Sequence, residues 1–174
     1  MEPRRNVNEE KNAETGMGVE RKDGVQVEKE IVINRSAQEL YRFWRNLENL
    51  PRFMHHLKSV RVLDDKHSHW VVRGPLGKEV QWEAEIVNDV PNERIGWQSL
   101  PDSHVRNAGS VQFIPSGNNR TLVRVVLRYD PPAGKLGEVV SKLLGENPGH
   151  EVEEDLKRLQ SELERAGSTA RRAA

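Results

Sequence analysis

The chain has 174 residues, a length that suits one domain with a hydrophobic core and leaves no room for a second domain of usual size. Its 27 lysine and arginine residues balance its 27 aspartate and glutamate residues, so no overall field draws the protein to nucleic acid or to anionic lipid. It contains no cysteine, which excludes disulfides, thiol catalysis and thiolate metal sites, and fits a reducing compartment.

Both ends of the sequence are predicted to be disordered tails. Residues 1–24 are polar and charged, without the apolar run that a signal peptide needs, and residues 167–174 are small and polar. No stretch has the length and apolarity of a membrane span. We therefore expect a folded domain over residues 25–166 and a cytoplasmic location. The arginines at 171 and 172 leave peripheral contact with a membrane open.

The first predicted elements are a strand and a capped helix. Apolar and polar residues alternate over 25–33, which is typical of a half-buried strand. Ser36 and Glu39 then have the spacing of a capping box, in which hydroxyl and carboxylate satisfy unpaired amides at a helix start. The apolar positions that follow recur at helical spacing at Leu40, Phe43, Trp44 and Leu47. A helix packed on a sheet is expected here, followed by a short helical turn over 50–54.

From residue 57 the apolar period changes to two, which predicts an antiparallel meander. The expected strands are 57–64, 69–74, 78–90, 94–100, 107–115 and 121–130. Polar turns at 64–66, 75–77, 91–92 and 117–119 separate them, with a longer loop at 101–106. The longest strands are predicted to coil or to contain a bulge, so the sheet should bend around something.

The last predicted element is a helical segment with one apolar stripe. The stripe runs over 136–144, is interrupted at Gly145, and continues at Val152, Leu156, Leu159 and Leu163. Asn147 is a candidate cap and Pro148 suits the first turn. An antiparallel sheet with one apolar face must cover that face, and this late helix is the sizeable element available to do so. Space left between sheet and helix is the candidate site.

The inward phase of the strands supplies the candidate ligand-binding residues. Trp70, Trp82 and Trp97 are large side chains with a polar edge that suit a partly open pocket. Tyr129 and Ser99 are the polar groups that would orient a ligand carbonyl or hydroxyl. The complete predicted set is Trp70, Trp82, Ile86, Trp97, Ser99, Phe113, Leu127, Tyr129, Val140 and Leu144. The alternative for each of these residues is a place in a filled core.

Other chemistry-bearing residues favour no specific site. His67 and His69 share one face of a strand, but Trp70 and Val72 take the buried phase, so the histidines should face water and no metal site is predicted. The carboxylates at 83 and 85 lie on the face of their strand opposite to Trp82, so we expect them on a solvated surface. No nucleophile elbow or phosphate loop appears. We assign no catalytic residues and no cofactor.

Three sequence phrases are similar to a known family: Tyr-Arg-Phe-Trp-Arg-Asn-Leu-Glu-Asn-Leu-Pro-Arg-Phe-Met at 41–54, Gly-Ser-Val-Gln-Phe at 109–113 and Tyr-Asp-Pro-Pro at 129–132. Together with the layout over 25–163, they resemble the polyketide cyclase/dehydrase branch of the START/Bet v1-like (SRPBCC) superfamily, which includes coenzyme Q-binding Coq10-type proteins. The resemblance implies an α+β helix-grip fold. In this fold a curved antiparallel sheet of about seven strands grips a C-terminal helix, and two short helices follow the first strand. A break near Gly145 and Pro148 would depart from the family's continuous helix.

Members of this superfamily bind lipids, sterols, quinones or polyketides, and some are enzymes, so the fold alone does not decide function. We expect a non-catalytic protein that binds a small hydrophobic molecule, either a lipid, a quinone or a polyketide-like compound. The alternatives are a cyclase or dehydratase acting on a polyketide-like substrate, and a protein-interaction module with a closed cavity. No nucleic-acid partner is expected.

Overall fold

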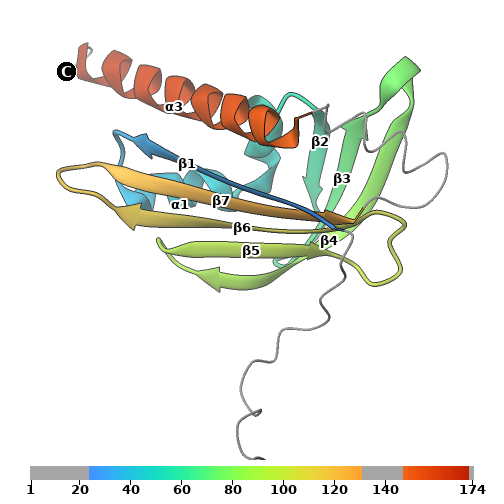
Figure 1. Cartoon of the computed structure of the whole chain (residues 1–174). Helices are drawn as coiled ribbons and strands as arrows, with labels where there is room; N and C mark the ends of the chain where they lie inside the picture. Colours follow the sequence, from blue (N-terminus) through green and yellow to red (C-terminus); the bar gives the residue numbers. More distant parts are fainter. Residues whose placement is uncertain (1–23, 131–146, 173–174) are drawn as a thin grey trace, which may run out of the picture.

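The computed structural model describes residues 24–130 and 147–172. Seven strands form one antiparallel sheet in the order β1-β7-β6-β5-β4-β3-β2 (Figure 1). The strands are β1 Val25–Ile33, β2 Leu57–Val62, β3 His67–Arg73, β4 Glu79–Val90, β5 Arg94–Ser99, β6 Arg106–Pro115 and β7 Thr121–Asp130. The helices are α1 Ala37–Arg45, the 3₁₀ helices η1 Leu47–Arg52 and η2 Pro75–Gly77, and α3 Pro148–Arg172. This is the predicted helix-grip arrangement.

The sheet is strongly curved, as the long strands predicted. β2 and β3 stand steeply to the plane of β6 and β7 in Figure 1. The pairing of β4 with β5 contains an irregularity between Ile86 and Asn88, and the intervening Val87 is 55% exposed. Such a bulge increases the local twist and bends the strand. The curvature creates the concave face on which the helices pack.

β1 closes the sheet by pairing with β7 over its whole length, from Val25 opposite Tyr129 to Ile33 opposite Thr121. Each strand from β2 to β7 pairs with the next one in sequence, whereas β1 pairs with β7, the last strand in the chain. This long-range pairing brings the start of β1 beside the end of β7. Both ends become part of the candidate site described below.

The capping box at the start of α1 is present as predicted. The Ser36 hydroxyl accepts a hydrogen bond from the Glu39 amide at 3.2 Å, and the Ser36 amide donates to the Glu39 carboxylate at 3.0 Å. Trp44 on α1 lies 5.3 Å from the ring of Phe53 and 6.3 Å from that of Phe113 on β6. The cap therefore fixes the start of a helix whose inner face joins the core.

Replacing Ser36 with alanine is expected to lower the free energy of unfolding by about 1 kcal/mol, because the Glu39 amide loses the hydroxyl that accepts its hydrogen bond. The Ser36 backbone hydrogen bond lowers the pKa of Glu39 from 4.5. The stabilisation is therefore present above pH 4.5 and is lost as the pH falls through the lower folded value. Urea unfolding at neutral and acidic pH measures both effects. Ser59→Ala, at an exposed serine on β2, is the control; an equal loss there would contradict the assignment.

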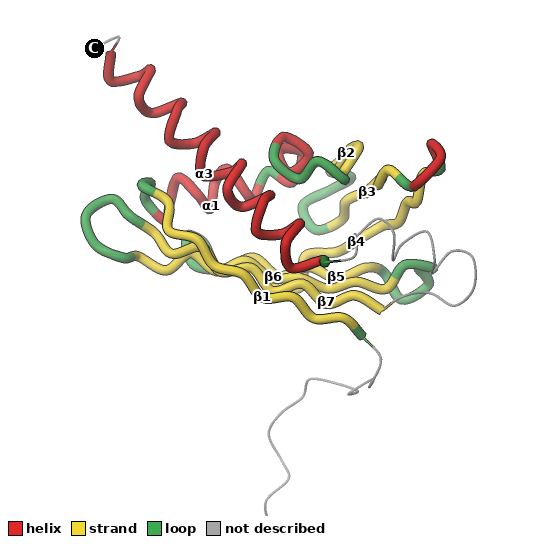
Figure 2. Tube along the Cα trace, turned by 45° about the horizontal axis from the view of Figure 1, so that its top comes forward, coloured by secondary structure: helices red, strands yellow, loops and turns green. Residues whose placement is uncertain are grey.

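Helix α3 lies over the concave face beside β1 (Figures 1 and 2). Its predicted start is confirmed: Asn147 Oδ1 accepts a hydrogen bond from the His150 amide at 3.2 Å, and Pro148 occupies the first turn. The predicted stripe faces the core, where Val152, Leu156 and Leu159 are buried. The stripe over 136–144, and with it the question of a break at Gly145, lies outside the described residues.

The C-terminal end of α3 differs from the sequence prediction. A tail was expected from Gly167, but the helix continues to Arg172. Gly167 has a packing role here, because a β-carbon at this position would overlap the Arg35 guanidinium. That guanidinium donates to the carbonyls of Leu163 and Glu164. Glycine is costly inside a helix, but here its lack of a side chain leaves room for Arg35, which follows β1.

The alternation of β2 puts Val62 on the same face as the buried Val60, but Val62, the last residue of the strand, is 39% exposed. The strand ends there at the sheet edge, where little covers it.

Among the described residues, no helix is long and apolar enough to cross a membrane.

Candidate functional site

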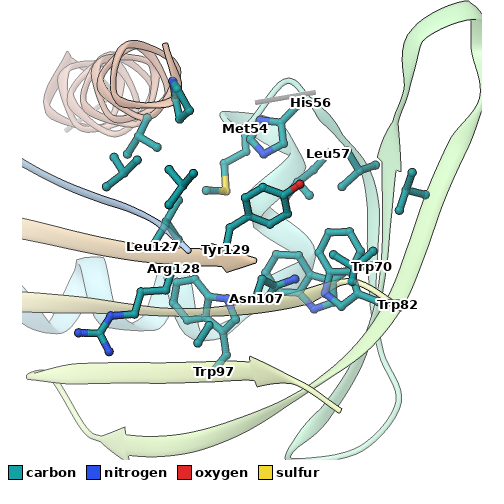
Figure 3. A pocket seen from close by; sticks show the side chains of 18 residues that line it. Met54, His56, Leu57, Trp70, Trp82, Trp97, Asn107, Leu127, Arg128 and Tyr129 are labelled. Atoms are coloured by element: carbon teal, nitrogen blue, oxygen red, sulfur yellow. The ribbon is translucent and has the colours of Figure 1, made fainter. Parts of the chain in front are cut away.

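An apolar pocket lies between the first turns of α3 and the bend of the sheet (Figure 3). Its open volume is about 110 Å³. Eight elements and their flanks contribute to it: all seven strands of the sheet and the start of α3. The lining residues are Val25, Val27, Met54, His56, Leu57, Trp70, Val72, Val80, Trp82, Trp97, Val105, Asn107, Ala108, Leu127, Arg128, Tyr129, Pro148 and Val152.

One wall of the pocket is a stack of three indole rings. Trp70 lies in the middle, 5.9 Å from the ring of Trp82 and 6.3 Å from that of Trp97, with interplanar angles of 21° and 20°. The Trp70 Nε1–H donates to the buried Ser68 hydroxyl at 2.8 Å, which fixes the central ring. Stacked aromatic rings present a broad, rigid apolar surface to a ligand.

Gly109 on β6 makes room for this wall. It pairs with Trp97 on β5 and with Leu127 on β7, so the three positions lie side by side across the sheet. A β-carbon at Gly109 would stand 2.6 Å from Cε2 of Trp97 and 2.9 Å from Cδ2 of Leu127, well inside contact distance. The Trp97 indole therefore occupies the space that a side chain at 109 would need.

Few polar groups reach the pocket. The Nε1 of Trp82 is buried and has no hydrogen-bond acceptor among the described residues, so it is a donor that a ligand acceptor would satisfy. The Tyr129 hydroxyl lies on the side of the cavity that faces Leu57 and His56 (Figure 3). The Arg128 side chain points away from the cavity, and its Nε donates to Gln26 at 2.9 Å.

The structure places the predicted site residues in three groups. Five of them line the pocket: Trp70, Trp82, Trp97, Leu127 and Tyr129. Ile86 and Phe113 are buried in the main core, away from the pocket lining, and the Ser99 hydroxyl accepts a hydrogen bond from the Asn107 amide at 3.1 Å. Ser99 thus holds the strand that follows the loop at 101–105. Val140 and Leu144 lie outside the described residues. A ligand contact for any of these side chains stays a prediction.

Behind the His56 side of the pocket lies a charged cluster. Asp155 on α3 is 1% exposed, and its Oδ2 stands 3.6 Å from Nδ1 of His56, which lines the pocket. The Arg158 guanidinium contacts the other carboxylate oxygen, Oδ1, and its Nε donates to the Phe53 carbonyl at 2.9 Å. Asp155 Oδ2 has no hydrogen bond within the described part of the chain. Histidine, carboxylate and guanidinium therefore lie in sequence from pocket to surface.

Burial perturbs both titrating members of this cluster. It lowers the pKa of His56 from 6.5 to about 4, assisted by Arg158 and His55 and opposed by Glu151. Burial also raises the pKa of Asp155 from 3.8 to about 6, against the hydrogen bond and charge of Arg158. Both shifts have one cause, because an apolar surrounding disfavours each charged form. At pH 7 the cluster therefore contains a neutral imidazole beside a carboxylate.

The two shifts have opposite effects on stability. The His56 contribution is lost as the pH falls from 6.5 through about 4, whereas the Asp155 contribution is lost as the pH rises from 3.8 through about 6. Between pH 4 and pH 6 the pair holds one proton in the unfolded chain, on the imidazole, and one in the folded protein, on the carboxyl. The folded and unfolded states then bind equal numbers of protons. The pair adds almost no pH dependence to folding.

The surface groups weighed in the sequence take up local roles. His67 Nδ1 contacts Asp64 at 2.9 Å, and His69 Nε2 lies 3.1 Å from the side-chain oxygen of Gln81. Glu83 is exposed and Glu85 accepts a hydrogen bond from Gln98 at 2.8 Å. Among residues 24–130 and 147–172, no three histidine, aspartate or glutamate side chains gather in a way that could hold a metal ion.

Comparison with known proteins identifies the family. The sequence profile described as "Polyketide cyclase / dehydrase and lipid transport" matches residues 33–157, most of the chain. The chain belongs to this family. The family membership agrees with the helix-grip fold of the START/Bet v1-like superfamily, while the narrower likeness to Coq10-type proteins stays a prediction.

Individual relatives of this polyketide cyclase/dehydrase family member cover most of its length. A solved structure from Deinococcus radiodurans is 39% identical, covers 82% of this chain and 99% of its own, and has a TM-score of 0.67. An uncharacterised 17.2 kDa protein of Streptomyces lincolnensis is 25% identical over 144 residues, which are 81% of this chain and 91% of that protein. A START superfamily protein from Mycobacterium smegmatis, 21% identical, shares the fold with a TM-score of 0.60 over 81% of this chain and 98% of its own.

Sequence reasoning missed the most polar part of this family member's site. His56 directly precedes the strand predicted from residue 57, and Asp155 lies among the many charged residues of α3, so neither residue was predicted as part of a site. The signal for Asp155 is its spacing: it lies three residues after Val152 and four before Leu159, inside the apolar stripe. A carboxylate at such a position is buried unless the stripe is narrow. His56 has no comparable signal. It directly follows His55, and the sequence does not show which of the two histidines is exposed and which is half-buried.

Proposed function

We propose that the protein binds a small hydrophobic molecule, such as a lipid, a quinone or a polyketide-like compound, in the pocket between the sheet and α3. The observation that carries the proposal is the open volume beside the three stacked indoles, where a filled core would have no space. A closed interaction module would lack this volume. The family's description, which names lipid transport and polyketide cyclisation, supports the same class of ligand.

The pocket's size points to what enters it. A cavity of about 150 Å³ lined by aliphatic and aromatic side chains binds benzene. The open volume of about 110 Å³ therefore suits one ring or a short acyl segment. Val25, 39% exposed, belongs to the lining, so the wall reaches the surface and the remainder of a longer ligand would extend past it.

Apolar burial alone gives modest affinity in a pocket of this size. Burying one ring or branched aliphatic group contributes about 1.5–3 kcal/mol, and ordering the ligand offsets part of that. Tight binding therefore calls for polar groups that fix the ligand's orientation. Trp82 Nε1 and the His56 imidazole are such groups in the lining.

Ligand binding is tested by extraction and by titration. Protein purified without detergent is extracted with organic solvent, and the extract is analysed by mass spectrometry. In parallel, the tryptophan emission is followed during titration with naphthalene, 1,4-naphthoquinone and decanoate. We expect saturable quenching or a spectral shift with at least one probe, since three of the four tryptophans line the pocket. No bound compound and no saturable response would overturn the proposal.

Filling the pocket from β7 is expected to abolish binding without loss of stability. In Leu127→Trp a larger ring would take the open volume, so probe affinity should fall about 10-fold or more. The melting temperature should hold or rise, because filling a cavity commonly adds stability. Val126→Trp places the same ring one residue away, on the outer phase of the strand, and should bind like wild type. Equal binding by Leu127→Trp and wild type would place the ligand elsewhere.

A further inference from the structure

The Asn107 side chain is a polar group of the pocket that the fold itself does not use. Asn107 lines the cavity (Figure 3) and follows the inward phase of the buried Val111 and Phe113 on the same strand. Its backbone N–H donates to the Ser99 hydroxyl at 3.1 Å, which holds the residue in place. Among the described residues, neither Nδ2 nor Oδ1 of its side chain has a hydrogen-bond partner. The amide is therefore available to a ligand.

Asn107 belongs to a polar row across the sheet. It pairs with Tyr129 on β7, and Ser99 on β5 lies on its other side. Side chains directly opposite each other on neighbouring strands lie on the same face of the sheet. Two residues away along the same three strands lies an apolar row, made of Trp97, Gly109 and Leu127. The wall that the sheet gives to the pocket therefore changes from apolar to polar within one repeat of the strands.

The polar row lies toward the surface end of the cavity. Val25, which lines the cavity and is 39% exposed, pairs with Tyr129 of the polar row. Val27, which also lines the cavity and is half-buried, pairs with Leu127 of the apolar row. A ligand whose ring lies on the indole wall would therefore place its next substituent beside Asn107.

The lining offers no charge to that substituent at neutral pH. The Arg128 side chain points away from the cavity, and its Nε donates to Gln26 (Figure 3). Burial lowers the pKa of His56 to about 4, so this imidazole is uncharged at pH 7. Asp155 lies behind His56 and is paired with Arg158. A charged ligand group would lose its hydration without gaining a counter-ion, so the pocket favours an uncharged group.

We propose that the ligand carries an uncharged oxygen group, a carbonyl or a hydroxyl, next to its apolar ring or chain, and that the Asn107 carboxamide binds this oxygen. Asn107 is then the residue that sets the polar specificity of the site. The inference rests on the proposed function, because it requires a ligand in the pocket. It adds the ligand's functional group and the side chain that recognises it.

Desolvation of the amide gives Asn107 its selectivity. A ligand that fills the pocket displaces water from the carboxamide, and a ligand oxygen replaces the lost hydrogen bonds, whereas a hydrocarbon leaves the amide unpaired. Nδ2 can donate to a carbonyl or hydroxyl oxygen, and Oδ1 can accept from a hydroxyl. A site built to hydrogen-bond a polar group rejects analogues that lack this group. The pocket should therefore distinguish ligands of equal shape by a single oxygen.

Two ring-sized probes of nearly equal shape test the proposal by calorimetric titration. Acetophenone has a carbonyl oxygen where α-methylstyrene has a methylene group. Asn107→Leu keeps the size of the side chain and removes its amide, so acetophenone affinity should fall about 10-fold while α-methylstyrene affinity holds or rises. 1-Phenylethanol, the corresponding alcohol, should lose affinity as acetophenone does. Benzoate, which is charged, should bind the wild-type protein about 10-fold or more weakly than acetophenone.

Gln112→Leu is the matched control. Gln112 lies between Val111 and Phe113, on the opposite phase of β6, and does not line the pocket. This substitution also removes a side-chain amide from β6, but it should leave the affinities of all four probes as in wild type. An equal loss of acetophenone affinity in Gln112→Leu and Asn107→Leu would contradict a direct contact with Asn107.

Spectroscopy reports the hydrogen bond itself and covers the case in which a variant fails to fold. In the wild-type protein the Nδ2 proton resonances of Asn107 should shift when acetophenone binds and stay in place with α-methylstyrene. The carbonyl stretching frequency of bound acetophenone should lie below its value in cyclohexane, because its oxygen accepts a hydrogen bond. In Asn107→Leu this frequency should return toward the cyclohexane value. A merely structural role for Asn107 would move neither signal.

This inference and the proposed function can fail separately. Suppose that α-methylstyrene binds in the pocket, but that both oxygen compounds bind Asn107→Leu as tightly as wild type and leave the Asn107 resonances unmoved. Recognition by Asn107 is then wrong and the proposed function stands. Benzoate binding as tight as that of acetophenone would overturn the requirement for an uncharged ligand. If no probe binds in the pocket, both proposals fail.

Discussion

Trp97→Ala is expected to lower the free energy of unfolding by about 3–5 kcal/mol, the largest effect of a single side chain in the site. Trp97 is 5% exposed, belongs to the main core cluster and stacks on Trp70 at 6.3 Å. Truncation removes the transfer free energy of the indole and leaves a cavity beside a fixed neighbour, because Ser68 holds the Trp70 ring. The cavity would then merge with the pocket.

Urea unfolding measures this loss as a lower midpoint at an unchanged m-value. Trp82→Ala is the matched control within the same stack. Trp82 is only partly buried, and its Nε1 is an unpaired donor whose removal relieves a cost, so its truncation should destabilise less. The enlarged pocket of Trp97→Ala should also favour naphthalene over a single-ring probe. Equal destabilisation by the two truncations would contradict the role given to Trp97.

Gly109→Ala should destabilise the protein by about 1–3 kcal/mol and weaken ligand binding, although alanine suits a strand better than glycine. The new methyl group would stand 2.6 Å from Cε2 of Trp97 and 2.9 Å from Cδ2 of Leu127. Trp97 has no room to retreat toward the stacked Trp70, so the indole is pushed into the open volume. The added methyl group therefore overpacks the core and also reduces the open volume of the pocket.

The control is a glycine on the neighbouring strand. In Gly96→Ala the nearest atom to the new methyl is Cβ of Asn88 at 3.2 Å, which a small shift relieves, and neither residue lines the pocket. A double-mutant cycle gives the sharper test. In a Trp97→Leu background the clash partner is gone, so Gly109→Ala should cost much less than in wild type, with a coupling of about 0.5–3 kcal/mol. Additive effects would show that Gly109 and Trp97 do not interact as described.

The same contact explains one of the family phrases. Gly109 opens the segment Gly-Ser-Val-Gln-Phe, whose inward residues Val111 and Phe113 are buried. The two apolar residues follow the strand pattern. The glycine has no side chain, so the Trp97 ring can lie over β6 and complete the indole wall. This glycine therefore contributes to the pocket wall of this protein.

The order of elements could be predicted from the sequence because the signals are local. A capping box at Ser36 and Glu39, the Asn147–Pro148 start of α3 and the period-two strands are all decided within a few neighbouring residues. The inward phase was also right for most strand positions, since one buried face repeats every second residue. Val62 shares the phase of Val60 but is 39% exposed at the end of its strand, so phase alone does not predict burial.

Which inward residues border open space could not be predicted, because that depends on distances between elements. Ile86, Phe113 and Trp97 share the same alternation, yet of these three only Trp97 lines the pocket among the described residues. Volume remains where three bulky indoles meet the start of α3 and the bend of the sheet. No period along the chain encodes that separation.

The sequence by itself determined the helix-grip class, the concave apolar face and the absence of thiol chemistry, because hydrophobic period, caps and composition are properties of the chain. Only the tertiary structure shows that Asp155 lies behind His56 and that Arg158 contacts the Asp155 carboxylate. It also shows that the Trp97 indole occupies the space beside Gly109. Each of these pairs is brought together by the long-range packing of α3 and the strands on one curved sheet. Burial then gives the acid and the base their altered pKa values.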